Sequence, residues 1–308
     1  MRRRVLLALA IWQAIAAMAD DGSRLWLRLP AAVPSAVIDV SGAERASDDE
    51  QTTIRLAVSE LQAHWQGLPV ALRLTNEPGI GRDAFRIAKV EEDSFRISAS
   101  SASGLLYGAY FILRSQMMGD GCLCQTLPPT HELTESPKNE KRSFSVKKAA
   151  LLFKRSTAFA RAMCSIGVNE VILPPSNNKK VSALADSLRP YGIVVTFDAT
   201  PSATPLQLTS DANWTGDHLK QFSWYAAGRR LWQPDVSDER LAYEWLAQTF
   251  NDNPHFIITM RDALLSPSGA EYAERFLETW QQMQSYIDDE RYDEVRELLQ
   301  VRLEEENQ

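Results

Sequence analysis

Three aspartates near the ends of predicted strands are the residues whose type suits proton transfer. Asp198 follows the apolar run 193–197, and Asp211 and Asp217 lie on either side of a polar turn that precedes a helical stretch. Two carboxyl groups held close together can act as a general acid and a general base. Loop aspartates are more often helix caps and turn formers, and we favour that interpretation for all three.

Three tryptophans gather next to these acids. Trp214, Trp224 and Trp232 lie within residues 211–234, although the chain has only eight tryptophans. Trp224 and Trp232 belong to an apolar helical stretch, so we expect them in the core. Trp214 is flanked by Asn213, Thr215 and Gly216 in a turn, and its pattern fits a core position and the wall of a binding site equally well.

Composition excludes several function classes. The chain has 308 residues with a net charge of -7, and its basic residues are scattered among acids, which argues against a nucleic-acid partner. The spacing of the histidines and cysteines predicts no metal site (His64, His131, His218 and His255; Cys122, Cys124 and Cys164). We find no glycine loop that would cradle a phosphate, and we predict no cofactor.

The first 19 residues are typical of a signal peptide. A basic "MRRR" precedes an apolar run and the small residues "AMA", which predicts cleavage before Asp20. The run is short for a membrane span. We therefore expect a secreted or periplasmic protein with no membrane partner after cleavage. The alternatives are an uncleaved anchor and the start of a buried helix.

The remaining pattern predicts a mixed α/β fold. Residues 20–120 alternate strand-like runs (24–29, 36–41 and a hairpin within 84–100) with two helices, which indicates an N-terminal α+β domain. Residues 121–147 are rich in Pro, Lys and Glu and are predicted as a linker.

In residues 148–235, segments with a helical pattern alternate with short apolar segments typical of buried strands, as in parallel β/α units. They are too few for a closed (β/α)8 (TIM) barrel, so we expect an incomplete barrel with no more than about four parallel strands. Residues 236–308 are predicted to be helical. Their apolar stripe is either core or the interface of a homodimer, and its members are Tyr272, Phe276, Trp280, Met283 and Ile287.

Several segments, in this order, resemble the alpha-glucuronidases of glycoside hydrolase family 67. They are residues 21–29, 101–114, 159–177, 188–202, 213–250 and 275–305, of which "SGLLYGA" and the "NWTG", "GR" and "W.P" of 213–234 are the most specific. The resemblance implies removal of 4-O-methylglucuronic acid from xylan oligosaccharides in xylan breakdown. It also places Asn213 and Trp214 near the sugar pocket, where the indole would stack on a pyranose ring and the amide would bind hydroxyls.

The departures from the family are as informative as the matches. Only about a dozen residues separate the strand-like 193–199 from Asn213, where the family has its middle barrel strands and catalytic carboxylates. No catalytic residue can therefore be carried over. We expect a family member with its interior excised, inactive alone, with acidic xylo-oligosaccharide as the candidate ligand of Trp214 and Asn213. The alternative is a non-catalytic remnant that binds carbohydrate or protein, or an incorrectly joined gene model.

Overall fold

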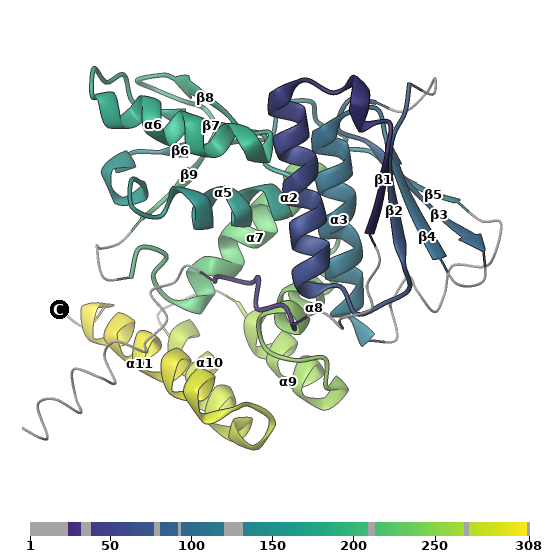
Figure 1. The fold of residues 1–308 in the computed structure, drawn as a ribbon. Helices are drawn as coiled ribbons and strands as arrows, with labels where there is room; N and C mark the ends of the chain where they lie inside the picture. Colours follow the sequence, from purple (N-terminus) through teal and green to yellow (C-terminus); the bar gives the residue numbers. More distant parts are fainter. Residues whose placement is uncertain are drawn as a thin grey trace, which may run out of the picture.

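The computed structural model describes residues 24–31, 38–76, 81–91, 94–119, 132–208, 213–267 and 271–306. These residues form two separate sheets and a group of C-terminal helices (Figure 1). The mixed α/β class predicted from the sequence is confirmed. The predicted signal peptide, Asp211, Cys122, Cys124 and His131 lie outside the described residues.

The first sheet has five strands in the order β1-β2-β4-β3-β5. β1 pairs parallel with β2, and β2 pairs parallel with β4. β3 is antiparallel to both of its neighbours, β4 and β5. The strands are β1 (Ile38–Ser41), β2 (Val70–Leu74), β3 (Phe85–Glu91), β4 (Ser94–Ala99) and β5 (Glu132–Glu135). The predicted hairpin is the β3–β4 pair.

Two long helices, α2 (Asp48–His64) and α3 (Ala102–Gln116), lie side by side against this sheet (Figure 1); a short 3₁₀ turn, η1 (Ala43–Arg45), precedes α2. Ser47 begins α2 with a capping box, since its side chain accepts from the Glu50 amide and the Glu50 carboxylate accepts from the Ser47 amide. Gly108 lets α3 approach the strands closely, because a Cβ there would stand 2.5 Å from Ile97.

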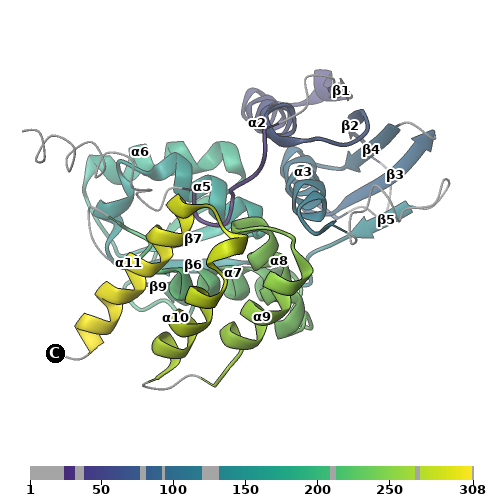
Figure 2. The same ribbon diagram turned by 90° about the horizontal axis from the view of Figure 1, so that it is seen from below.

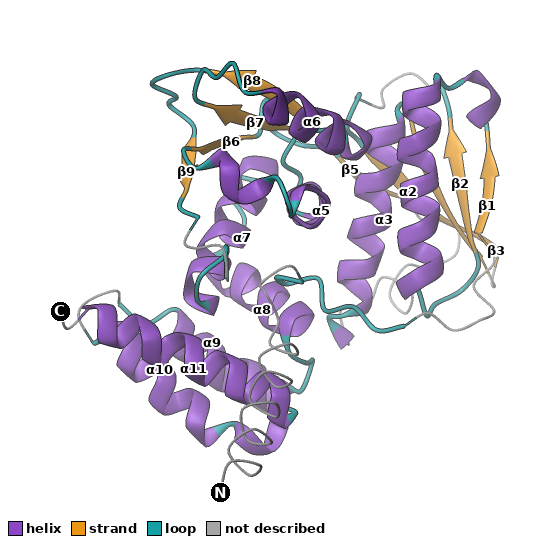
Figure 3. Cartoon of the chain, turned by 60° about the vertical axis from the view of Figure 1, so that its left-hand side comes forward, coloured by secondary structure: helices purple, strands orange, loops and turns teal. Residues whose placement is uncertain are grey.

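The second sheet has four strands, all parallel, in the order β8-β7-β6-β9. Its elements are β6 (Ser143–Val146), η3 (Ala149–Leu152), α5 (Ser156–Ser165), β7 (Glu170–Leu173), α6 (Lys179–Leu188), η4 (Arg189–Tyr191), β8 (Val194–Phe197), β9 (Thr204–Leu206) and α7 (His218–Trp232). Figure 3 shows these strands at the periphery of the molecule, with α5 and α6 on one side.

The C-terminal part is helical, as predicted, and comprises α8 (Asp238–Thr249), α9 (Pro254–Leu264), α10 (Tyr272–Gln282), η5 (Gln284–Tyr286) and α11 (Asp289–Glu306) (Figure 2). Phe276 and Trp280 of the apolar stripe are buried against neighbouring helices, and Trp280 stacks on Tyr292 of α11. Much of the stripe is thus used within the chain. Homodimer formation through these helices stays a prediction.

Three local predictions differ from the structure. The stretch expected as a linker contains β5 and β6, so the first sheet takes its fifth strand from beyond residue 120. β5 was missed because its sequence, "ELTE", is short and polar, as suits an edge strand. The helix with which the helix–strand pattern of 148–235 was expected to begin is divided in the structure into η3 and α5.

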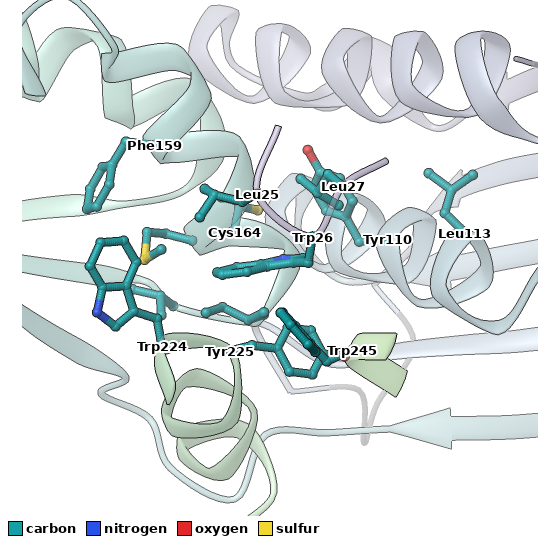
Figure 4. Packing of buried hydrophobic residues seen from close by; sticks show 14 of the residues in the cluster. Leu25, Trp26, Leu27, Tyr110, Leu113, Phe159, Cys164, Trp224, Tyr225 and Trp245 are labelled. Atoms are coloured by element: carbon teal, nitrogen blue, oxygen red, sulfur yellow. The ribbon is translucent and has the colours of Figure 1, made fainter. Parts of the chain in front are cut away.

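The third difference concerns residues 24–29, which were expected as a strand. They form a turn-containing segment in which Leu25 has a positive φ of 50°. Leu25, Trp26 and Leu27 are buried in the core (Figure 4). The Trp26 indole donates to Ser165 Oγ at 2.9 Å and meets Tyr225 edge-on. An apolar run that is buried on several sides has the same composition as a strand, which explains the error.

Candidate functional site

The carboxyl-terminal edge of the parallel sheet is the expected location of a ligand site in this type of fold. The residues that directly follow the strands there are Lys147, Pro174, Asp198 and Gln207. Asp198 is the one carboxylate among them. It is exposed, and its Oδ1 accepts a hydrogen bond from the Thr200 amide at 2.9 Å, so it forms a turn.

Asp217 also has a structural task. It is the N-cap of α7, and its Oδ1 accepts from the Lys220 amide at 3.1 Å. The same oxygen lies 3.3 Å from Arg302 Nη1 of α11. The two candidate aspartates that the structure describes are therefore a turn former and a helix cap, as we favoured from the sequence.

Trp214 lies in the core. Its side chain is 0% exposed, and its ring contacts those of Phe159 and Trp224 at centroid distances of 6.0 and 6.3 Å. The indole nitrogen has no hydrogen-bond partner in the part of the chain that the structure describes. A sugar could stack on Trp214 only after the covering residues moved. Trp224 and Trp232 are buried too, as predicted.

Asn213 organises the turn that leads into α7. Its Oδ1 accepts from the backbone amides of Thr215 and Gly216 and from the Thr215 hydroxyl, each at 3.0–3.1 Å. Its amide nitrogen donates to the Gly216 carbonyl at 3.3 Å. The roles of Asn213 and Trp214 in substrate binding stay predictions, and the contacts seen here are those of a turn and a packed core.

A buried charge cluster lies elsewhere, around Glu244 of α8. Its carboxylate accepts hydrogen bonds from the Tyr225 hydroxyl (2.9 Å), Arg229 Nε (3.1 Å) and Arg240 Nε (2.9 Å). Arg114 Nε of α3 lies 3.9 Å away. Burial would raise the pKa of Glu244, but the three arginines outweigh it and lower this pKa to about 2. Glu244 is therefore ionised at physiological pH.

The sequence pattern did not predict this cluster, whose members are Arg114, Arg229, Arg240 and Glu244. These four side chains come from three helices and meet only in the folded chain. One signal was available, since Arg114 is the lone charge in the apolar helix "ASGLLYGAYFILR". A buried arginine at such a position needs an anionic partner.

Two cavities lie near residues that precede the parallel strands. The first, of about 340 Å³, opens beside the Glu244 cluster and is lined by Gly167, which comes before β7. The second, of about 540 Å³, is lined by Arg142 and Asn169, which come before β6 and β7. Both are on the opposite edge from Asp198. In barrel folds this amino-terminal edge serves stability rather than catalysis.

The described residues offer neither a metal site nor a membrane-spanning helix. Among them, no group of three His, Cys, Asp or Glu side chains is arranged to hold a metal ion. None of the helices that the structure describes has the length and apolarity required to cross a membrane. Cys164 is a buried free thiol whose pKa is raised by burial.

Comparisons with solved structures give only distant likenesses. A family GH115 4-O-methyl-alpha-glucuronidase is 12% identical with a TM-score of 0.38, over 85% of this chain and 40% of that one. A glycoside hydrolase family 20 beta-N-acetylglucosaminidase is 16% identical with a TM-score of 0.35, over 55% and 41%. Likenesses at this level bear on neither fold nor function.

Sequence comparisons point to α7, α8 and α9. Residues 215–268 match the model of the glycosyl hydrolase family 67 C-terminus. A probable alpha-glucuronidase A of Aspergillus niger is 33% identical over 60 residues, which are 20% of this chain and 7% of that protein. The matched stretch thus spans a small fraction of the curated relative. Over this segment the chain is similar to the alpha-glucuronidases of glycoside hydrolase family 67, which agrees with the resemblance found in its sequence.

Proposed function

We propose that this protein is a secreted alpha-glucuronidase-family glycoside hydrolase that lacks the central catalytic part of its barrel and is inactive alone. The observation that carries the proposal is the family 67 match over residues 215–268. The substrate class of the family would be xylan oligosaccharides that carry 4-O-methylglucuronic acid. Acidic xylo-oligosaccharide is accordingly the ligand we propose for Asn213 and Trp214.

The order of the parallel strands supports an incomplete (β/α)8 barrel. In a closed eight-stranded barrel the last strand pairs with the first, and each strand is followed by a helix. β9 pairs parallel with β6, the first strand of its sheet, and is followed by α7. β6, β7 and β8 would then be barrel strands one to three and β9 strand eight. The four strands between them would be missing from the interval 198–203.

The absence of these strands would also account for the absence of a catalytic acid and base. An inverting glycosidase holds its acid and base carboxyl groups about 6.5–9.5 Å apart across the sugar. The middle strands of the barrel would supply such groups at the carboxyl-terminal edge. In this chain Asp198 and Asp217, the candidates that can be placed, are committed to a turn and a cap.

An assay on aldouronic acid oligosaccharides tests the proposal. We expect no release of glucuronic acid above background from the purified protein, whereas a full-length family 67 enzyme provides the positive control. General acid–base assistance contributes roughly 10²–10⁴-fold, so turnover comparable to the control would refute the loss of the catalytic part. Sequencing the N-terminus of exported protein tests secretion, and Asp20 is the expected first residue.

Ligand binding needs a separate measurement because it can survive without catalysis. Calorimetry with an acidic xylo-oligosaccharide compares wild type with Trp214→Phe, which keeps an aromatic ring in the core. A weaker interaction of the variant would support a sugar contact by the indole. Equal heats of binding would leave Trp214 as a packing residue and remove it from the proposed site.

A further inference from the structure

The cavity beside Glu244 has a wall formed from parts of the chain that are far apart in sequence. Phe111 and Arg114 come from α3, Arg229 and Trp232 from the end of α7, and Arg240 from α8. Its volume of about 340 Å³ is at the small end of the range for ligand pockets. A molecule of about monosaccharide size is therefore the largest ligand to consider.

The charged side chains that line this cavity are balanced in number, with Arg114, Arg229 and Arg240 facing Glu135, Asp235 and Glu244. Three guanidinium groups surround a single buried carboxylate, that of Glu244. Arg114 and Arg229 are both almost fully buried, and the pKa of Arg114 is lowered by burial and by the nearby charge of Arg229. Glu135 and Asp235 are less buried than Glu244, and the charge of Glu135 acts on the pKa of both Arg114 and Arg229.

The arginines use only part of their hydrogen-bonding capacity. Arg229 and Arg240 each donate to Glu244 through Nε, and Arg114 donates through Nη1 to the Ser165 carbonyl at 3.2 Å. Within the described ranges, the terminal nitrogens of Arg229 and Arg240 make no hydrogen bond. These nitrogens are not sealed in the core either, so the cavity is where they can find a partner.

We propose that this cavity is a binding site for a small carboxylate anion, held by the terminal nitrogens of Arg229 and Arg240. The planar guanidinium group pairs with a carboxylate through two parallel N–H···O bonds, which makes this anion the best match. The anion would supply acceptors to the terminal nitrogens of Arg229 and Arg240, which make no hydrogen bond among the described residues. The aromatic side chains of Phe111 and Trp232 give the body of the ligand an apolar wall.

This site is independent of the proposed alpha-glucuronidase ancestry. It lies beside Gly167, at the amino-terminal edge of the parallel sheet, whereas a barrel active site lies at the carboxyl-terminal edge. A failed hydrolysis assay would therefore leave the proposal for this cavity intact. Conversely, failure of carboxylate binding would leave the family relationship unaffected.

Titration with glucuronate and with glucose tests the site, because the two sugars share a ring and differ in the carboxylate. We expect binding of glucuronate at low ionic strength, followed by NMR shifts of the indole N–H signals, and no binding of glucose. Added salt should weaken the interaction, since it screens charge pairs that are open to solvent. Equal binding of both sugars, or of neither, would overturn the proposal.

A matched pair of variants locates the binding. Arg240→Gln removes one cation from the cavity, and the variant should fold because this side chain is 48% exposed. Arg230→Gln removes a similarly exposed arginine from the end of α7 that pairs with Asp238 and does not line the cavity. We expect the Kd for glucuronate to rise about tenfold in Arg240→Gln and to stay unchanged in Arg230→Gln. Equal effects of the two substitutions would contradict the assignment.

Discussion

The two sheets of this protein differ in how completely the chain covers them. The central strand β4 of the first sheet has both neighbours in place, and Phe95 within it is buried. The parallel sheet ends at β8, where Val194 and Phe197 are 59% and 53% exposed. Strands of parallel sheets are normally buried on both faces. The first sheet thus has a covered central strand, whereas the parallel sheet exposes apolar side chains on its edge strand β8.

The same comparison shows that the two regions share one core. Arg142, which precedes β6, is fully buried and donates from Nη2 to Asp83 Oδ2 at 2.6 Å, next to β3. Its guanidinium lies 5.0 Å from the centre of the Trp232 ring of α7. Trp26 makes a second link through Ser165 of α5. These buried contacts attach the parallel sheet to the first sheet.

The largest effect we expect is on the free energy of unfolding, and one matched substitution in each sheet tests it. Phe95→Ala should lower the free energy of unfolding by about 3–5 kcal/mol because it empties a core position. Phe197→Ala removes the same group from an exposed edge strand and should change it by less than about 1 kcal/mol. Urea unfolding followed by circular dichroism measures both. Similar losses would mean that β8 is as well packed as β4.

A second expected effect is a loss of folding stability at low pH, and it arises at His218 at the start of α7. His218, the first residue of α7, is buried against Phe250, and neither ring nitrogen has a hydrogen bond among the residues described. Burial and then the charge of Arg28 lower its pKa to about 3, although Glu294 Oε1 lies 3.5 Å from Nε2. The folded protein therefore holds His218 neutral at a pH where the unfolded chain protonates it.

The sign of the pH dependence follows from this difference. Between pH 6.5 and about 3 the unfolded state binds the extra proton, so stability is full above pH 6.5 and falls as the pH is lowered. The loss is up to about 1.4 kcal/mol per pH unit. Glu244, with its lowered pKa, adds a further loss from pH 4.5 down to about 2.

The variant His218→Phe tests the origin of this slope. It keeps an aromatic ring beside Phe250 and removes two polar nitrogens that lack partners, so we expect unchanged or higher stability at neutral pH. The slope of the unfolding free energy between pH 6.5 and 4.5 should flatten. An unchanged slope would assign the acid sensitivity to other groups. Thermal unfolding at a series of pH values gives the comparison.

Elements whose signals are local could be predicted from the sequence. The first of the two helices expected within residues 20–120 is α2, and the hairpin expected within 84–100 is the β3–β4 pair. Residues 236–308 were expected to be helical, and α8 begins there after Ser237, whose side chain accepts from the Arg240 amide. In each case the residues that determine the structure are within a few positions of one another.

Features that depend on distant partners could not be predicted. Nothing near "ELTE" shows that β3 will pair with it, and nothing in 24–29 shows that Trp26 will reach Ser165, 139 residues away. The cation cluster around Glu244 joins α3 to α7 and α8 in the same way. Trp214 is the intermediate case, because its turn was visible in the sequence whereas its burial depended on Phe159.

A smaller loss of stability is expected from substitutions in the turn between the parallel sheet and α7. Asn213→Ala removes the oxygen that accepts from the Thr215 and Gly216 amides, and should lower the free energy of unfolding by about 1 kcal/mol. Asn213→Asp keeps an acceptor in the same position and should lose less. Chemical denaturation distinguishes them. Equal losses would assign the whole effect to the amide nitrogen, which donates to the Gly216 carbonyl, and none to the oxygen.

The smallest effect on stability is expected at the open edge itself. Val194→Thr and Phe197→Ser replace exposed apolar groups of β8 with polar ones, and should change the free energy of unfolding by no more than about 0.5 kcal/mol. An apolar edge strand with unpaired backbone groups favours pairing with another chain. We therefore expect the double variant to associate less than wild type when sedimentation is followed over a range of concentrations. The single change Val90→Thr provides the control, because this side chain is 45% exposed on β3, a strand that is not at the edge of its sheet. If wild type sediments as a monomer throughout, the exposed apolar side chains of β8 do not promote association, and this prediction is wrong.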